Sequence, residues 1–463
     1  MVRGKNYAFI SGFFLIFIEI LLSFQTFCQS SNPSDKPDSL NYKIALWFQF
    51  KDAAVTITFD DGIRSHFTTA VPMLNERSLK GSFYVVTNFI GKGFTPGWDT
   101  LNEVARQGHE IGSHSMNHAN MSNLAAYPKF ADSLRKELSD SRDIINRNIP
   151  SQKCESFCWP GGAVSPLAID IAKRYYLACR ASGNLLNYAG VQDFYNIQSL
   201  PIYHNTLLST ANYWIDQAIQ VKGWLIERIH GIKTGKDSTG YEPVPVNVLK
   251  NHWDYIVKNE KQLWVATFSN VIKYIRERDG TKLKIIDYQN GNFRISISNN
   301  LPDSAYYLPL SLKIKLIGLL NNFREIQQNG RSLQYEVHKE ITKKDTVNYV
   351  VFEAIPDKGD ITIYIPIEFI TNYREPFGSA VQITFGLTRR QKVKLCVYNS
   401  EGKIVKHSKR KFNQGVNNIK FDGRKLADGT YPYSLECDKG YIYWSKLILN
   451  KDGNVVSQKA RQL

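Results

Sequence analysis

The chain has 463 residues, of which 43% are hydrophobic and 22% are charged. A chain of this length usually forms roughly two to four domains, and the composition excludes a fibrous or mainly disordered protein. The formal net charge of +16 indicates acidic partners such as polyanionic glycans or lipid head groups. Lys and Arg are nevertheless scattered, and no basic stretch is interleaved with stacking aromatics, so a nucleic-acid partner is not expected.

Residues 1–30 have the layout of a secretory signal peptide. Arg3 and Lys5 precede an apolar run over 7–24, and the small and polar residues TFCQSS follow it. We expect cleavage near Cys28. An uncleaved membrane anchor is the alternative, because the run approaches the length that spans a bilayer. The protein is therefore predicted to be secreted or held at the cell surface, with membrane contact only through this segment.

Five cysteines remain after this cleavage: Cys154, Cys158, Cys179, Cys396 and Cys437. The odd number leaves at least one thiol free or paired between chains. Cys154 and Cys179 could form a disulfide bridge. The alternative is that these cysteines are small buried core residues.

Residues 31–278 are predicted to form a parallel β/α barrel. Short apolar runs alternate with amphipathic stretches, and several runs end in a polar or glycine-rich turn. Ser165 and Pro166 are typical of a helix start, and VPVNVLKNHWDYIVKNE is expected to be the last long helix. The predicted strands are AVTITF, GSFYVV, HEIGSH, ESFCWPGG, YLACRAS and GWLIERIH.

Two β-rich, sandwich-like domains are predicted to follow the barrel. Residues 279–372 contain LKIIDY, FRISIS, YLPLSLKIKLIGL, YVVFEAI and ITIYIP, separated by turns rich in Asn, Gly and Pro. Residues 373–463 contain QITFGL, KVKLCVYN, NNIKF, GTYPYSLEC and IYWSKLILN. The fold class is therefore α/β, with a barrel followed by two β domains.

The segment TITFDDG places two adjacent carboxylates at the end of a buried strand, where a barrel collects its functional groups. If the chain is extended there, Asp60 and Asp61 point in opposite directions. One carboxylate can then bind a metal ion while the other moves protons. By itself, however, Asp-Asp-Gly is more often only a polar turn.

His114 and His118 are four residues apart, a spacing that places two imidazoles on one face of a helical turn. With Asp61 they form a set that leaves coordination positions open for water and substrate. Zinc suits this set best, and Co²⁺, Ni²⁺ or Mn²⁺ could replace it. His230, at the end of GWLIERI, is a candidate general acid, with a core histidine as the alternative.

The remaining histidines are given no catalytic function. His109, inside GHEIG, is interpreted as structural. No spacing pattern assigns a role to the others, which are His66, His204, His252, His338 and His407.

The segments TFDDG and HSMNH and the strand ending in His230 resemble, in the same order, the first, second and last motifs of the polysaccharide deacetylase family, also called the NodB-homology or carbohydrate esterase 4 group. The resemblance covers about half of the chain and implies a distorted (β/α) barrel with its site at the strand carboxyl ends. It implies that Asp60 is the base, that Asp61, His114 and His118 bind the metal ion, and that His230 is the acid.

The chain departs from the family pattern twice. The third motif usually has an arginine two residues before a proline, whereas this chain reads FCWPGG. We expect Arg180, at the end of the next strand, to replace that arginine by pairing with Asp60, because a cation there keeps the base ionised and oriented. A structural surface arginine is the alternative. The family's Asp-x-x-Asp-Trp motif, which orients the catalytic histidine, has no match.

The segment EPFGSAVQITFGLTRRQKVKLCVYNSEGKIV and the residues after it, to about residue 450, resemble the C-terminal sorting domain of the type IX secretion system of Bacteroidota. The resemblance implies export across the outer membrane with the type IX machinery as partner. A carbohydrate-binding β-sandwich is the alternative.

These features together predict metal-dependent removal of acetyl groups from a polysaccharide or oligosaccharide. The acetyl group is either the N-acetyl of glucosamine polymers or the O-acetyl of plant-type glycans. The tetrahedral oxyanion is expected to bind a backbone N–H between Trp159 and Gly161. The main alternative is a non-catalytic glycan-binding protein on a degenerate barrel, suggested by the two departures. A hydrolase of other C–N bonds is a further alternative, and so is a non-haem iron oxygenase, although the oxygenase needs neither a second carboxylate nor an acid histidine.

Overall fold

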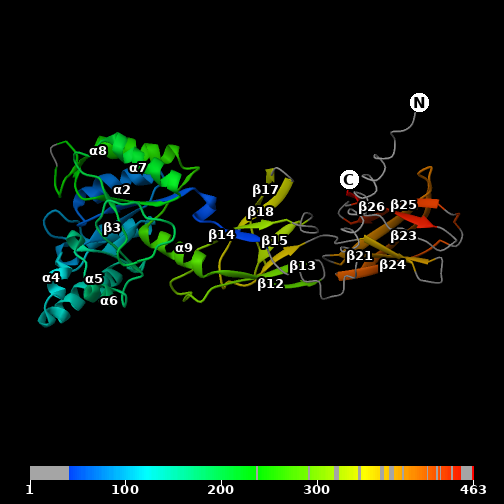
Figure 1. The fold of residues 1–463 in the computed structure, drawn as a ribbon, viewed down its shortest axis with the longest axis horizontal. Coiled ribbons are helices and arrows are strands. Elements are labelled where there is room, and N and C mark those ends of the chain that lie inside the picture. The colour runs from blue at the N-terminus through cyan, green and yellow to red at the C-terminus, as the bar shows by residue number, and fades with distance from the viewer. Residues whose placement is uncertain are drawn as a thin grey trace, which may run out of the picture.

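The computed structural model describes residues 41–235, 238–289, 292–316, 323–341, 346–364, 370–374, 380–387, 390–413, 415–423, 426–427, 429–438, 442–449 and 461–462. The predicted signal segment 1–30 lies outside the described residues. Figure 1 shows three bodies in a row, a mixed α/β body followed by two β bodies. Within the described part of the chain, no helix has the length and apolar character needed to cross a membrane.

A parallel sheet organises the first body. Its strands follow the order β6-β5-β4-β3-β2-β8-β7, and β11 also pairs with β2. All pairs are parallel, so the carboxyl ends of the strands meet at one end of a curled half-barrel. This arrangement confirms the predicted (β/α) fold, although β7 and β11 were not predicted. The strands are β2 Ala53–Phe59, β3 Gly81–Val85, β4 Glu110–Ser113, β5 Ser156–Cys158, β6 Ala178–Arg180, β7 Leu200–Pro201, β8 Trp224–Ile229 and β11 Leu263–Val265.

Helices connect these strands and cover the sheet (Figure 1). Ser165 caps α6 as expected, because its side chain accepts a hydrogen bond from the Ala168 N–H. The expectation that the segment from 244 to 260 is the last long helix is wrong, since α9 follows it. The helices are α2 Val71–Glu76, α3 Trp98–Arg106, α4 Met121–Ala125, α5 Ala131–Asn148, α6 Pro166–Ala172, α7 Leu208–Val221, α8 Val246–Lys258 and α9 Phe268–Gly280.

Two apolar layers lie on the two faces of the sheet. Side chains such as Phe59, Phe83 and Trp253 belong to the larger core, which joins the strands to the covering helices. Trp224 and Phe268 belong to a smaller core on the other face. Alternation of side chains along each strand explains this division.

Helix α9 closes the end of the half-barrel opposite the strand carboxyl ends. The Phe268 N–H donates to Ser82 Oγ over 2.9 Å. The Ser269 N–H donates to the buried Glu110 carboxylate over 3.0 Å. Because Glu110 begins β4, these bonds hold the first turn of α9 at the amino ends of the strands.

The middle body contains two antiparallel sheets, with strand orders β1-β14-β18-β17 and β12-β13-β19-β15-β16. Alternating side chains of both sheets form its core, including Phe293, Leu312 and Phe352. The strands are β1 Tyr42–Ile44, β12 Lys282–Gln289, β13 Asn292–Ser298, β14 Leu310–Lys315, β15 Glu325–Gln328, β16 Arg331–Ser332, β17 Tyr335–Ile341, β18 Thr346–Ala354 and β19 Ile361–Tyr364.

Strand β1 precedes the parallel sheet in the chain but belongs to the middle body. Tyr42 pairs with Ile314, and Ile44 pairs with Leu312, in an antiparallel register with β14. Residues just before the half-barrel therefore complete a sheet of the following body, which the sequence did not predict. The predicted domain boundaries, at residues 30, 278 and 372, stay predictions.

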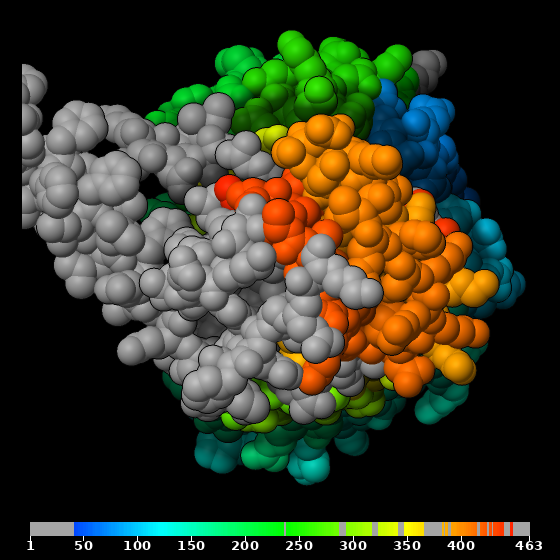
Figure 2. Space-filling view, turned by 90° about the vertical axis from the view of Figure 1, so that its right-hand side faces the viewer, coloured from blue at the N-terminus to red at the C-terminus, as the bar shows by residue number. Residues whose placement is uncertain are grey.

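The last body has a three-stranded sheet, β20-β21-β24, and a five-stranded sheet, β23-β22-β25-β26-β27. Figure 2 looks at this end of the molecule, with these strands in orange and red. Phe385, Leu395 and Tyr433 lie in its core. The strands are β20 Ile370–Arg374, β21 Ala380–Leu387, β22 Gln391–Tyr398, β23 Ile404–Phe412, β24 Gly415–Asp422, β25 Gly429–Cys437, β26 Ile442–Leu449 and β27 Arg461–Gln462.

The five cysteines of the described residues are buried free thiols: Cys154, Cys158, Cys179, Cys396 and Cys437. The bridge considered between Cys154 and Cys179 is therefore not formed. Their burial agrees with the alternative interpretation as small core residues.

Candidate active site

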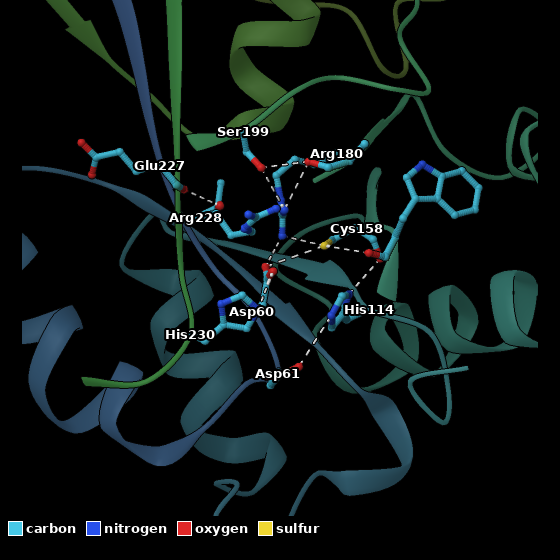
Figure 3. Close-up of polar contacts among 12 residues, drawn as sticks. Asp60, Asp61, His114, Cys158, Arg180, Ser199, Glu227, Arg228 and His230 are labelled. Atoms are coloured by element: carbon cyan, nitrogen blue, oxygen red, sulfur yellow. Dashed lines mark hydrogen bonds and ion pairs between the residues drawn. The ribbon is translucent and has the colours of Figure 1, made fainter. Parts of the chain in front are cut away.

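The candidate residues converge at the carboxyl ends of the parallel strands (Figure 3). Asp60, His114 and His230 each follow the last residue of a strand, namely β2, β4 and β8. Arg180 is the last residue of β6. A parallel sheet gathers such positions at one edge, so residues far apart in sequence become neighbours.

Asp60 is almost fully buried, with 3% of its surface exposed. Burial alone would raise the pKa of its carboxyl group. The positive charge of Arg180, together with His230 and His114, outweighs burial and holds the pKa of Asp60 well below its usual value. Asp60 therefore stays ionised and able to accept a proton.

Arg180 is fully buried and donates from Nη2 to Asp60 Oδ1. Its Nη1 donates to Ser199 Oγ over 3.2 Å, and its guanidinium lies 5.5 Å from the centre of the Tyr84 ring. Although burial lowers the pKa of a guanidinium, Asp60 raises the pKa of Arg180 above its ordinary value. The expected pairing with Asp60 is thus present, and Arg180 does not lie at the surface.

Asp61, His114 and His118 surround a common point. Asp61 Oδ1 lies 3.6 Å from His114 Nε2 and 3.4 Å from His118 Nε2. One ligand atom from each residue lies within 4.8 Å of the others, which is close enough for a single ion to join them. Asp61 is partly exposed, and 42% of the His118 side chain is exposed, so water and a substrate can reach this point.

The backbone conformation that brings these ligands together differs from the expected one. The segment from His114 to His118 is a loop after β4 and not a helical turn. Ser115 and His118 have φ angles of 68° and 57°, in the left-handed region. Asp61, with a φ of 75°, is not extended either. The histidines converge because this loop folds back on itself.

Glu137, on helix α5, holds the loop in place. Its carboxylate accepts hydrogen bonds from the backbone N–H groups of Met116 and Asn117, both over 2.9 Å. It also accepts one from Asn117 Nδ2, over 2.6 Å. The sequence analysis missed this residue. Its only local signal is an acidic side chain on the buried face of an amphipathic helix.

A second group of potential ligands consists of Asp60, His114 and Cys158. It suits a cation less well, because the guanidinium of Arg180 already contacts both Asp60 and Cys158. Burial also raises the pKa of the Cys158 thiol well above its usual value, which disfavours the thiolate. In contrast, His114 Nδ1 bonds to the Cys158 carbonyl oxygen over 2.8 Å, which aims Nε2 at Asp61. The residues of the Asp61 group fit a divalent metal ion better.

His230 lies beside the base, with its Nε2 3.5 Å from Asp60 Oδ2. Within the described residues, its buried Nδ1 has no hydrogen-bond partner, in agreement with the missing Asp-x-x-Asp-Trp motif. Burial lowers the pKa of His230, Asp60 partly opposes this effect, and Arg180 and Arg228 add to it.

His66 contacts the backbone of His230, and the sequence analysis did not predict this contact. His66 is fully buried, and its Nε2 bonds to the backbone carbonyl oxygen of His230. Its ring also packs 5.1 Å from the ring of Phe59. His66 therefore fixes the backbone of His230, while in the described part of the chain no acidic residue bonds to the His230 Nδ1.

Comparison with known families agrees with both resemblances. Residues 49–179 match the family model described as polysaccharide deacetylase, and residues 373–450 match the model of a secretion system C-terminal sorting domain. The two resemblances predicted from sequence motifs are therefore confirmed.

Individual relatives are distant. A gellan lyase from Bacillus sp is 24% identical over 69% of this chain, which spans 13% of that protein. The putative polysaccharide deacetylase YxkH of Bacillus subtilis is 24% identical over 27% of this chain, which spans 42% of it. The solved Streptococcus pyogenes deacetylase PplD, in complex with acetate, has a TM-score of 0.27 and 21% identity, covering 31% of this chain and 64% of that one.

Proposed function

We propose that the chain is a metal-dependent deacetylase that removes acetyl groups from an acetylated carbohydrate. The observation that carries this proposal is the separation of two adjacent carboxylates. Asp60 is buried, ionised and paired with Arg180, while Asp61 faces His114 and His118. Metal-dependent hydrolysis uses both parts, a base for the attacking water and a cation for the carbonyl oxygen. The polysaccharide deacetylase match supports the reaction class.

Asp61, His114 and His118 would hold the ion, and zinc suits two imidazoles and a carboxylate best. When bound, the ion supplies Lewis acidity for the acetyl carbonyl and lowers the pKa of a water molecule. Asp60 accepts the proton of the attacking water. Arg180 keeps Asp60 ionised and limits its rotation through a charge-assisted hydrogen bond.

Among the backbone N–H groups from Trp159 to Gly161, only that of Gly161 is proposed to bind the developing oxyanion. Of the positions from Trp159 to Gly161, the Trp159 N–H already donates to Arg180 O over 3.0 Å, and Pro160 has no N–H. A Cβ added at Gly161 would meet no other atom within 4 Å, so open space surrounds this position. Its N–H is therefore the proposed oxyanion donor.

His230 donates a proton from Nε2 to the departing amine or alcohol. This nitrogen lies 3.5 Å from Asp60 Oδ2. The proposed base and the proposed acid are therefore close enough to act on the same substrate group. The product acetate and the deacetylated sugar then leave on the side of His118, whose side chain is 42% exposed.

A polysaccharide substrate and an extracellular location are part of the proposal. The likeness to a protein named gellan lyase, over 69% of this chain, supports action on polysaccharides. The sorting-domain match at residues 373–450 supports export by a type IX system to the cell surface or medium. The alternative, a glycan-binding protein without activity, is supported by the lack of a hydrogen-bond partner at His230 Nδ1 among the described residues.

Acetate release by the full chain tests the proposal. Acetylated chito-oligomers and acetylated xylan would be compared before chelation, after chelation and after zinc is added back. Asp60→Asn should abolish release while zinc binding persists, and the exposed Asp170→Asn on α6 serves as the control. Zinc binding without release from any acetylated glycan would favour the glycan-binding alternative.

A further inference from the structure

An exposed aromatic side chain stands beside His230. The ring of Tyr241 lies 5.4 Å from the His230 ring, at an angle of 76°. Behind it, the ring of Tyr203 packs edge-on at 5.9 Å. Tyr241 keeps 59% of its surface exposed, although a ring of this size normally gains from burial.

The backbone holds Tyr241 firmly in this exposed position. Its carbonyl oxygen accepts a hydrogen bond from the Gly231 N–H over 3.1 Å, directly after His230. The preceding Gly240 packs so closely that an added Cβ would lie 2.6 Å from Ile63 Cδ1 and 2.9 Å from Gly231 Cα. The loop that carries Tyr241 is therefore fitted against the turn that follows Asp61.

Side-chain contacts join the loops that carry the two tyrosines. His204, next to Tyr203, pairs with Glu242, next to Tyr241. Glu242 has a φ of 46°, a conformation that non-glycine residues rarely adopt and that this contact helps to maintain. Arg228 Nη2 donates to Tyr203 Oη over 3.3 Å. Both tyrosines are thus ordered before any ligand binds.

We propose that Tyr241, supported by Tyr203, is a stacking platform for a pyranose ring of the substrate, next to the sugar that loses its acetyl group. This inference rests on the proposed function. It means that the substrate is a chain of sugars, with a second ring beside the acetylated one. The C–H face of a pyranose is apolar and flat enough to cover an exposed ring, while its hydroxyl groups stay in water. A platform ordered in advance lowers the entropic cost of binding.

Calorimetry and acetate release together test the platform. The probes are penta-N-acetylchitopentaose and acetylated xylo-oligosaccharides, with wild type, Tyr241→Ala and Tyr241→Phe in the full chain. Tyr241→Ala should weaken binding of one oligosaccharide series about tenfold and raise KM to a similar extent, with a smaller change in kcat. Tyr241→Phe keeps the ring and should restore binding. Tyr213→Ala, an exposed tyrosine on α7, is the matched control.

Binding and turnover separate the two proposals. If the wild type binds oligosaccharides through Tyr241 but releases no acetate, the platform stands and the deacetylase fails. If acetate is released with equal KM and affinity in wild type and Tyr241→Ala, the deacetylase stands and the platform is overturned. Lack of oligosaccharide binding by the wild type also overturns it.

Discussion

Cys158 and Arg180 lie directly opposite each other as Cα partners at the carboxyl ends of β5 and β6. The Nη2 atom of Arg180 lies 2.7 Å from Cys158 Sγ and also contacts the Asp60 carboxylate. Cys158 stands two residues before Pro160, at the position where the resembled family usually has its arginine. The guanidinium thus reaches the base from the adjacent strand.

Removal of the Arg180 guanidinium should lower both the activity and the stability of the protein. Arg180→Cys leaves the buried Asp60 carboxylate without its strongest partner, and breaking a buried pair in this way costs about 3–5 kcal/mol. We expect a lower melting temperature and a loss of acetate release of at least about a hundredfold. Both are measured on the purified full chain.

The exchange Cys158→Arg with Arg180→Cys supplies the second half of this test. Since the two positions are Cα partners, the double variant can return a guanidinium to Asp60 from β5. It should recover part of the activity lost in Arg180→Cys. Equal activity of the single and double variants would show that the strand carrying the arginine is decisive.

Glu137→Ala should weaken metal binding without removing a ligand. The Glu137 carboxylate accepts three hydrogen bonds from the loop between His114 and His118. Loss of such supporting contacts typically lowers metal affinity about 10–100-fold. Zinc affinity is measured by competition with a chelator, and acetate release should return at excess zinc.

Glu103→Ala is the control for this experiment, because Glu103 pairs with Arg106 on the exposed face of α3. Unchanged zinc affinity in Glu137→Ala would mean that the loop keeps its conformation without the carboxylate.

The pH dependence of kcat should report His230. Burial lowers the pKa of His230, so its protonated form is present only below the ordinary value of 6.5. A general acid must be protonated, and kcat should therefore fall as pH rises through this lowered pKa. Asp60 stays ionised over the same range because its own pKa is well below the usual value.

A pH profile of kcat for the wild type and His230→Gln checks this expectation. The variant should lose the fall on rising pH together with most of the activity. A wild-type kcat that does not fall with rising pH anywhere in the range where the protein stays folded would exclude His230 as the acid.

Glu277 should make stability depend on pH. It is buried on α9, and its carboxylate accepts a hydrogen bond from the Leu308 N–H over 3.1 Å. Burial raises its pKa from 4.5 to about 7, against the effect of this hydrogen bond. The folded state therefore binds the proton more tightly, and this contribution to stability is complete below pH 4.5 and is lost as pH rises to about 7.

Melting temperatures of wild type and Glu277→Gln between pH 4 and pH 8 measure this effect. The glutamine can accept the same hydrogen bond but carries no charge. Its advantage over the wild type should grow with pH, to on the order of 3 kcal/mol. Glu260→Gln, on an exposed turn, is the control. A difference that does not vary with pH would contradict the raised pKa.

The sequence predicted the parallel fold and the candidate residues because their signals are local. Asp60 and Asp61 are adjacent, and His114 and His118 form a short motif at a strand end. Arg180 could be inferred because the resembled family has an arginine in its third motif, which this chain lacks, and Arg180 ends the next strand. The helical turn predicted at His114 was wrong, because spacing alone does not distinguish a helix from a loop with left-handed residues.

Other features depend on contacts that no local pattern records. Glu137 lies twenty residues along the chain from the Asn117 N–H that it binds. His66 acts through a backbone carbonyl 164 residues away. Strand β1 has three residues, too few to show a periodicity, and its partner β14 lies in the middle body. Tertiary contacts of this kind become visible only in the folded chain.

The pairing of β1 with β14 means that the chain passes twice between the half-barrel and the middle body. It enters the half-barrel after β1 and leaves it from α9 into β12, and β1 and β12 belong to different sheets of the middle body. Two bodies joined by a single linker are expected to move relative to each other, and a second crossing at a separate point limits that movement. The two crossings therefore limit how far the half-barrel can turn relative to the sheets of the middle body. A single backbone cut between residues 45 and 52 would release that restraint without removing any proposed catalytic or metal-binding residue.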